Sequence, residues 1–331
     1  MNSAKLIQLL PTSISGDLSS KSIITYLSKT LGLPMLGLAI FLMVWQAGAS
    51  NIETSLGTFP GPAQVWQQAQ GLVDEHLAER QRADDFYSRQ QARNDKKLAK
   101  NPDAVVKWRE YTGKPTFFDQ IGTSLVTVLA GFAIASAIAI PLGVCIGLSA
   151  SLNAALNPVI QIFKPVSPLA WLPLVTMVVS AVYVSDDPMF AKSFITSLFT
   201  VALCCLWPTL LNTAVGVSSI SSDLQNVTKV LRLSWFTHVR KIVLPWSVPM
   251  IFTGLRLSLG IAWMVLIAAE MLAQNPGLGK FVWDEFQNGS SNSLGRIMVA
   301  VIVIGLIGFA LDRIMLLIQR KVSWDKSAVT R

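Results

Sequence analysis

Six stretches of mainly apolar residues recur along the chain, separated by segments that hold most of its charges. Each stretch is near the length that an α-helix needs to cross a bilayer, about 20 residues. The pattern therefore predicts an all-α membrane protein with six transmembrane helices. The expected spans are approximately 31–50, 121–149, 166–185, 193–217, 247–273 and 296–318.

The third stretch is the least regular of the six. Pro165, Pro168 and Pro173 each remove a backbone donor, which in lipid has to be compensated by burial against protein. Two interpretations stay open here. The segment is either a broken helix beside a transport pathway or an ordinary helix whose entry is marked by prolines.

Composition supports a membrane location. Only 14% of the 331 residues are charged, against about 25% in soluble globular proteins, and 52% are hydrophobic. These values exclude a disordered, collagen-like or disulfide-stapled chain. The net charge of +8 does not indicate nucleic-acid binding, because the basic residues flank the apolar stretches instead of clustering with aromatic ones.

Basic residues outnumber acidic ones in three polar segments, which the positive-inside rule assigns to the cytoplasm. These are the N-terminal segment 1–30, the loop 218–246 and the tail 320–331. Six crossings then place the segments 51–120, 186–192 and 274–295 outside.

The first apolar run ends in Ala47-Gly48-Ala49, which resembles a signal-peptidase site. A polar lead of about 30 residues is long for a signal peptide, so retention as a membrane helix is favoured.

The segment 51–120 is the only extended polar region, and it holds ten basic and ten acidic residues. Residues 72–100 lack Pro and Gly, which predicts a solvated helix on the outer face. The balanced charge argues against an electrostatic funnel for anions.

Small residues recur at every fourth position of the second span. A row with this i, i+4 spacing lets another helix approach closely over about four turns. We expect a helix-packing ridge within or between subunits, the alternative being a lipid-facing run with chance alanines. The ridge consists of Gly131, Ala135, Ala139, Gly143 and Gly147.

The fifth span carries Arg256, Trp263 and Glu270 at a spacing of seven, which places them on one helix face. Charged side chains are costly in lipid, so Arg256 and Glu270 should face protein or water. One hypothesis makes the three residues part of a translocation path, in which Arg256 meets an anion. In the other, Arg256 and Glu270 extend toward the two headgroup layers and serve structural pairing only.

The loop 218–246 is the longest polar segment on the expected cytoplasmic side. Its Ser222-Asp223-Leu224-Gln225 matches a capping box, which predicts a short helix. A second helical piece should run to Leu244-Pro245. The short helix is either a docking element for a cytoplasmic partner or an amphipathic helix that lies at the headgroups.

Patterns for catalysis or metal binding are missing from the sequence. Cys145, Cys204 and Cys205 lie inside apolar stretches without C-x-x-C spacing, and both histidines, His76 and His238, lie outside these stretches. Intramembrane Ser/His hydrolysis and paired-aspartate chemistry are therefore excluded, and no catalytic, cofactor-binding or metal-binding residue is expected.

Residues 277–280, Gly-Leu-Gly-Lys, resemble the end of a phosphate-binding loop. However, Gln274 and Phe281 stand where G-x-x-x-x-G-K-[ST] needs Gly and Ser or Thr. Any ATP-driven step must therefore belong to another subunit.

The end of the loop 218–246 resembles a known family. Ile242-Val243-Leu244-Pro245 matches the I-x-L-P that closes the motif E-A-A-x3-G-x9-I-x-L-P in permease subunits of bacterial ATP-binding-cassette (ABC) importers. The E-A-A positions hold Asn226, Val227 and Thr228, and the Gly position holds Arg232. The start of the motif therefore differs from the family pattern, and the glycine that usually allows a tight turn is missing. The resemblance assigns ATPase coupling to Ser222, Asp223, Gln225, Asn226, Lys229, Arg232, Ile242, Leu244 and Pro245.

A wider match covers residues 31 to 319 and resembles the taurine, sulfonate and nitrate branch of this family. The matching stretches are Phe59 to Trp66, Ile140 to Gly143, Pro165 to Pro173, Gly254-Leu255-Arg256 and Ala268 to Met271. The charged insert near 70–115, the Tyr111-Thr112-Gly113-Lys114-Pro115 that follows, and Asn275 to Ser293 are similar to the nitrate/nitrite type. A bicarbonate type in the same subgroup is very similar.

The resemblance implies the type I permease fold of ABC importers. The first transmembrane helix is then 31–50, the permease core 121–319 includes the coupling helix, and 51–120 is a charged external insert. The location implied is the bacterial inner membrane, with both termini cytoplasmic. The implied partners are a second copy of the chain, two cytoplasmic ATPase subunits or domains that bind ATP and Mg, and an external solute-binding protein.

The implied function is inward movement of a small inorganic anion, nitrate or nitrite before others, by alternating access that the ATPases energise. The chain is then a transporter subunit and not an enzyme. Bicarbonate, sulfonate and taurine are the alternative substrates. Two other classes stay open: an ATP-independent channel or carrier, and a membrane scaffold that moves no solute.

Overall fold

The computed structural model describes residues 32–54, 57–102, 105–184 and 189–322. They belong to two units, 1–67 and 68–331, which are considered separately. The predicted N-terminal segment 1–30, most of the tail 320–331 and part of 186–192 lie outside the described residues.

The first unit contains the apolar helix α3 (Leu33–Ala49), a hairpin of β1 (Glu53–Thr54) and β2 (Gly57–Thr58), and the start of α4 (Pro62–Lys100). The 17 residues of α3 span about 26 Å, slightly less than the hydrocarbon core of a bilayer. The indole N–H of Trp45 donates to the carbonyl of Pro60 at 3.2 Å and so holds the segment after the hairpin against α3.

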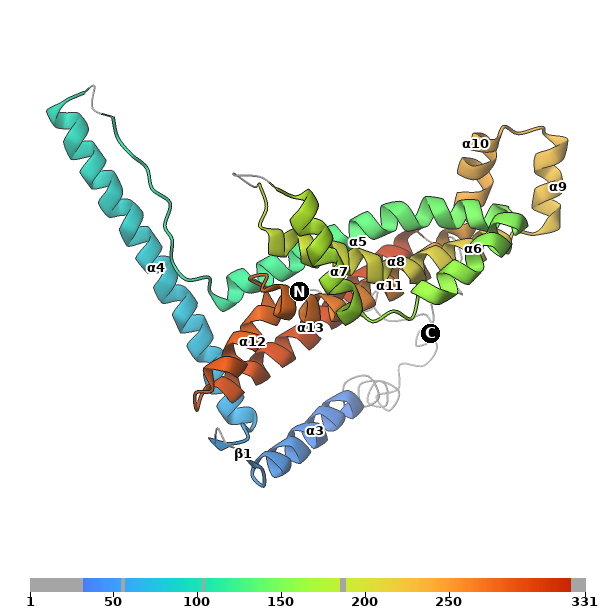
Figure 1. Cartoon of the computed structure of the whole chain (residues 1–331). Coiled ribbons are helices and arrows are strands. Elements are labelled where there is room, and N and C mark those ends of the chain that lie inside the picture. Colours follow the sequence, from blue (N-terminus) through green and yellow to red (C-terminus); the bar gives the residue numbers. More distant parts are fainter. Residues whose placement is uncertain (1–31, 55–56, 103–104, 185–188, 323–331) are drawn as a thin grey trace, which may run out of the picture. The chain divides into compact units, whose positions relative to one another are not determined.

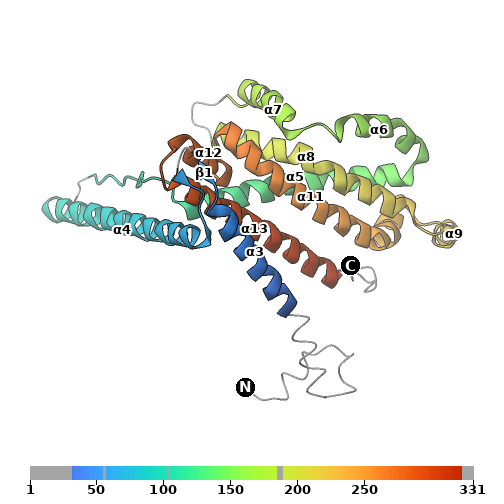
Figure 2. The same ribbon diagram turned by 90° about the horizontal axis from the view of Figure 1, so that it is seen from below.

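The second unit is built around α5 (Phe117–Leu148), α8 (Lys192–Ser218) and α11 (Leu244–Ala273), which lie side by side in Figures 1 and 2. Val128, Val201 and Leu266, one from each helix, are fully buried, so the hydrophobic core lies among these three helices. The other helices are α6 (Ala150–Phe163), α7 (Pro168–Val182), α9 (Ser222–Val230), α10 (Trp235–His238), the π-helix η3 (Val239–Val243), α12 (Leu278–Asn288) and α13 (Ser293–Val322).

Four helices in the described residues are long and apolar enough to cross a membrane: α5, α8, the continuous helix Trp235–Ala273, and α13. The pair α6 and α7 gives a fifth span if it is counted as one, and it is bent by 98°. All six predicted stretches contain helix, but α7 has only 15 residues and α6, which the sequence analysis does not predict, supplies the other half. The count of six crossings stays a prediction.

Candidate functional site

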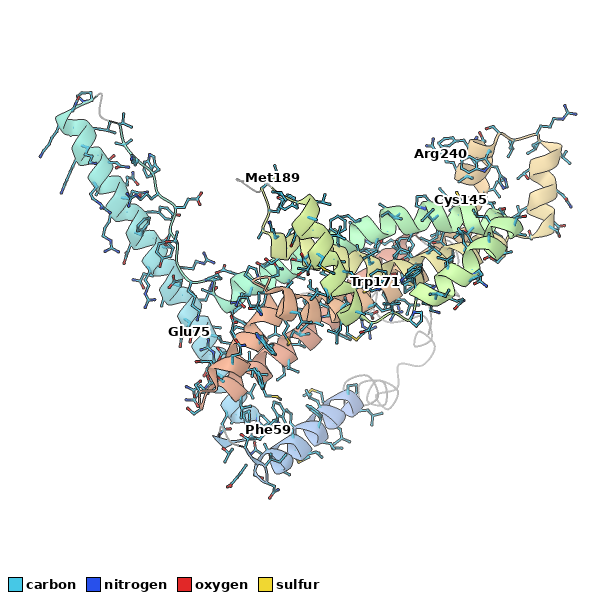
Figure 3. The ribbon with its side chains drawn as sticks, in the orientation of Figure 1. Phe59, Glu75, Cys145, Trp171, Met189 and Arg240 are labelled. Carbon is cyan, nitrogen blue, oxygen red and sulfur yellow. The ribbon has the colours of Figure 1, made fainter. Side chains whose placement is uncertain are left out.

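One end of the second unit carries the loop that the sequence analysis assigns to coupling. The predicted short helix is confirmed as α9, and the predicted second piece as α10 and η3, which lead into α11 (Figure 1). In Figure 3, Arg240 lies at this end and Glu75 at the opposite end. Ser222, Asp223 and Asn226 are exposed on α9. The Ser222–Gln225 capping bonds stay a prediction, because the side chain of Gln225, like that of Lys229, lies outside the described residues.

The sequence pattern does not predict the exposure of four large apolar side chains on α9, α10 and the turn between them. Val230, Leu231, Trp235 and Phe236 are all more than 60% exposed. An apolar surface of this kind at the end of a helix bundle is typical of a protein interface. The available signal was Trp235-Phe236, two adjacent aromatic residues in a polar loop. We call these four residues the coupling patch.

Arg232, beside the coupling patch, has a φ of 43°, in the left-handed region that favours glycine. A side chain in this conformation costs about 1–2 kcal/mol, which explains on steric grounds why the family motif has glycine at this position. The tight turn therefore forms in this chain despite the departure from the motif.

The I-x-L-P end of the motif joins the loop to the core. Val243 is fully buried in a cluster with Val144 of α5 and with Val217 and Ile220 at the end of α8. Pro245 cannot donate a hydrogen bond to the preceding turn, and the five residues before α11 form a π-helix. Movement of the loop would therefore act directly on two core helices. The motif residues Ile242 and Leu244 are half-buried and Pro245 is exposed.

The candidate path residues of α11 find partners within the chain. Arg256 forms two hydrogen bonds with the carboxylate of Asp312 on α13, at 2.5 and 3.0 Å, and Trp263 donates to the carbonyl of Ile304 at 2.9 Å. Trp263 and Glu270 are buried and line no open path in this structure. The structure thus supplies contacts for the pairing hypothesis, while a path role remains a prediction. Sequence reasoning missed Asp312, the only acidic residue in its span.

Glu270 caps the start of α12, because the N-cap residue, Gly277, has no side chain that could accept hydrogen bonds from the first backbone amides. One carboxylate oxygen accepts from the amide of Gly279 at 3.0 Å, and both accept from the hydroxyl of Ser124 on α5. The Ser124 oxygen in turn accepts from the amide of Leu278 at 2.8 Å. Two free amides of α12 are therefore satisfied by side chains of other helices.

The small residues of the predicted ridge lie on the face of α5 that packs against α8. Ala135 and Ala139 are buried. A Cβ added to Gly131 or Gly143 would come within 2.9 or 2.7 Å of a carbonyl oxygen of α8, and Gly147 faces α8 in the same way. The close approach therefore needs small residues.

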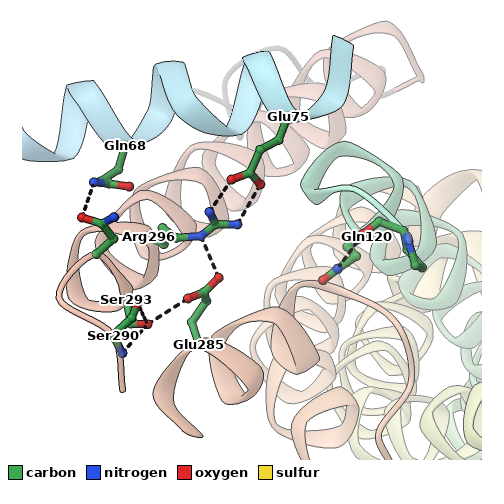
Figure 4. A network of polar contacts seen from close by, with 9 residues as sticks. Gln68, Glu75, Gln120, Glu285, Ser290, Ser293 and Arg296 are labelled. Atoms are coloured by element: carbon green, nitrogen blue, oxygen red, sulfur yellow. Dashed lines mark hydrogen bonds and ion pairs between the residues drawn. The ribbon is translucent and has the colours of Figure 1, made fainter. Parts of the chain in front are cut away.

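At the end opposite the coupling patch, ion pairs fix the base of α4 to the bundle (Figure 4). Arg296 of α13 pairs with Glu75 of α4 at 2.6 and 2.9 Å and with Glu285 of α12 at 2.6 Å. Arg80 of α4 pairs with Asp119 at the start of α5. Glu75, Glu285 and Arg296 border a cavity of about 500 Å³.

A hydrogen bond of 2.8 Å joins the hydroxyl of Tyr111 to the carboxylate of Glu79 on α4. This bond lowers the pKa of Glu79 and raises the pKa of Tyr111, since it favours the charged carboxylate and the neutral phenol. The described residues contain no cluster of His, Cys, Asp and Glu that could hold a metal ion.

Together, these features define a multi-pass helical membrane protein with a helical loop, α9 to η3, at one end. Residues 139–324 match the family model described as "Binding-protein-dependent transport system inner membrane component". This match covers more than half of the sequence, and the chain belongs to this family, the permease subunits of ABC importers.

Relatives of the chain carry different substrates in their names. The nitrate import permease NrtB of Synechococcus elongatus is 36% identical over 65% of this chain and 77% of its own length. The bicarbonate transport system permease CmpB of the same organism is 34% identical over 87% and 88%. The MetNI methionine ABC transporter in its inward-facing conformations covers 62% of this chain and 96% of its own, with 17% identity and a TM-score of 0.50, which supports the type I permease fold.

Proposed function

We propose that the chain moves nitrate into the cell as the permease subunit of an ATP-driven importer. Its similarity to permeases named NrtB, at 36% in Synechococcus elongatus and 31% in Synechocystis, is the observation that carries the proposal. Bicarbonate is the second candidate, favoured by the relative named CmpB, which matches 87% of the chain.

In the proposed mechanism, two copies of the chain form the path in the inner membrane and two ATPase subunits dock on the coupling patches in the cytoplasm. Those subunits hold ATP and Mg, and an external solute-binding protein delivers the anion at the other end. When the ATPases close, the loop transmits the movement through Val243 to α5 and α8 and switches access. Arg256, about one-third exposed beside Asp312, is the candidate electrostatic contact in the path.

Uptake into vesicles tests the substrate and the energy source. We expect labelled nitrate to accumulate in vesicles that contain this chain and its ATPases only when ATP is inside and the solute-binding protein is outside. Excess unlabelled nitrate should compete and bicarbonate should not. Accumulation of bicarbonate instead would transfer the proposal to the second candidate, and flux without ATP would support a channel or carrier.

Substitution of Phe236 by Asp tests the docking role of the coupling patch. A charge in an apolar interface costs desolvation, so the ATPases should no longer co-purify, and nitrate uptake should fall at least tenfold. Phe286→Asp is the matched control, because Phe286 is 62% exposed against 67% for Phe236 but lies on α12. Equal ATPase recovery with both variants would contradict the docking role.

A further inference from the structure

Residues 68–116 form an arm, built from α4 and the segment 105–116 that runs back beside it (Figure 1). The side-chain amide of Gln90 exchanges two hydrogen bonds with the backbone of Arg109, at 3.2 and 3.0 Å, and Asn94 donates to the carbonyl of Lys107 at 3.5 Å. These bonds bury Gln90 and Asn94 in the outer part of α4, 88–100, where every other side chain is exposed. The arm is therefore a two-part rod with a fixed register.

The clamp at the base sets the direction of this rod. Arg296 of α13 and Asp119 of α5 hold α4 to two helices of the bundle, and Figure 1 shows α4 turning away from the direction of α5 and α11. A rod that turns aside at the end of a membrane-spanning bundle stays close to the bilayer surface. This direction would carry its outer half along a bilayer surface and not away from it.

Charge is separated along the arm. The inner part, 68–87, has five acidic and two basic residues, whereas the outer part, 88–109, has seven basic and two acidic residues. Arg89, Arg93, Lys96 and Lys100 are spaced by four, three and four, so they share one face of α4 over about 17 Å. We call these four residues the basic stripe.

The basic stripe has no acidic partner among the residues that the structure describes. All four side chains are exposed, and none of them forms an ion pair there. Arg89 and Arg93 donate only to helix carbonyls, those of Asp85 and Arg89. Their positive charge is therefore available to an anionic surface.

Apolar side chains accompany this charge on the returning segment. Trp108 is 64% exposed and Val105 is 86% exposed, and the basic residues Lys107 and Arg109 lie on either side of Trp108 in the chain. Tryptophan beside Lys and Arg is the combination found where proteins rest in the interfacial layer of a bilayer.

We propose that the arm is a membrane-surface anchor, with the basic stripe on anionic lipid headgroups and with Trp108 and Val105 inserted between them. The bilayer that surrounds α5 and α11 begins beside the base of the arm, so the arm enlarges the contact with lipid that these helices already make. Each basic side chain near an anionic bilayer is expected to raise the bound-to-free ratio of the arm roughly fivefold.

A fluorescent label on the full-length chain tests this anchor. Val105→Cys is labelled with an environment-sensitive dye in a background where Cys145, Cys204 and Cys205 are Ala, and the protein is reconstituted in phosphatidylcholine with or without phosphatidylglycerol. With the anionic lipid we expect a several-fold brighter emission that is shifted to shorter wavelength. Salt at about 1 M should reverse the change, because the Debye length falls to about 3 Å.

Two variants with the same change in net charge separate the basic stripe from bulk charge. Replacing its four residues by Gln should remove the response to anionic lipid. Replacing Gln70, Gln81, Ser88 and Gln91, which are exposed on another face of α4 and are not three or four residues from the stripe, by Glu should leave most of it. The proposal is overturned if both variants lose the dye response equally, or if the dye does not respond to phosphatidylglycerol. It is also overturned if the dye responds in neutral lipid and only when the solute-binding protein is present.

Discussion

Replacing Glu270 by Ala should lower the stability of the protein by about 2–5 kcal/mol and loosen α12. The substitution leaves the Gly279 amide and the Ser124 hydroxyl without their acceptor in a fully buried site. An unsatisfied buried donor costs about 1–3 kcal/mol. It also removes the carboxyl from the amino end of a helix whose own cap is glycine. The loss should appear as a lower unfolding temperature in detergent and as faster amide exchange at the start of α12.

Two comparison variants separate this effect from a general loss of acidic residues. Glu270→Gln keeps an oxygen that can accept from Gly279, so it should be affected less than Glu270→Ala. Asp284→Asn, which removes only a half-exposed pair with Lys280 on the same α12, should change stability by less than about 1 kcal/mol. If Glu270→Ala unfolds at the temperature of the parent protein, Glu270 does not cap α12.

The spans and the ridge could be predicted because lipid restricts the sequence strongly. A bilayer fixes the length of an apolar helix, and a close helix contact needs small residues at every fourth position. Gly131 and Gly143 are therefore visible in the sequence, and the structure shows what they face on α8. Helices α6 and α12 escaped prediction because they are short, with 14 and 11 residues, and are positioned by the longer helices around them.

The partners of the polar residues could not be predicted, because they are distant in the sequence. Arg256 pairs with Asp312, 56 residues away, and Glu270 with Ser124, 146 residues away. Spacing within one helix identified the face of Arg256 and Glu270 but says nothing about the opposing helix. The arm is a different case, because the separation of charge between 68–87 and 88–109 is already visible in the sequence, and only the total over 51–120 appears balanced. The structure adds that these residues belong to one helix, α4, and the segment that runs back beside it.

Replacing Gly143 by Ala should destabilise the contact between α5 and α8 by about 1–3 kcal/mol and reduce the yield of folded protein. The new methyl group would lie 2.7 Å from the carbonyl oxygen of Leu210 and 2.7 Å from the Cβ of Thr213. A backbone oxygen cannot move aside without displacing the helix, so α8 has to shift. Thermal unfolding in detergent and the fraction of monodisperse protein measure the loss.

Gly122→Ala in the same helix is the matched control, because no atom lies within 4 Å of its added methyl group. Alanine has the higher helix propensity, so this variant should equal or exceed the stability of the parent protein. The double variant Gly143→Ala, Thr213→Ala should recover only a small part of the loss, because it removes the contact with the Thr213 Cγ2 at 3.0 Å and leaves the Thr213 Cβ and the Leu210 carbonyl in place. Equal unfolding temperatures for Gly143→Ala and Gly122→Ala would show that α5 and α8 do not need this close approach. Full recovery in the double variant would assign the whole clash to the Thr213 methyl group and not to the backbone of α8.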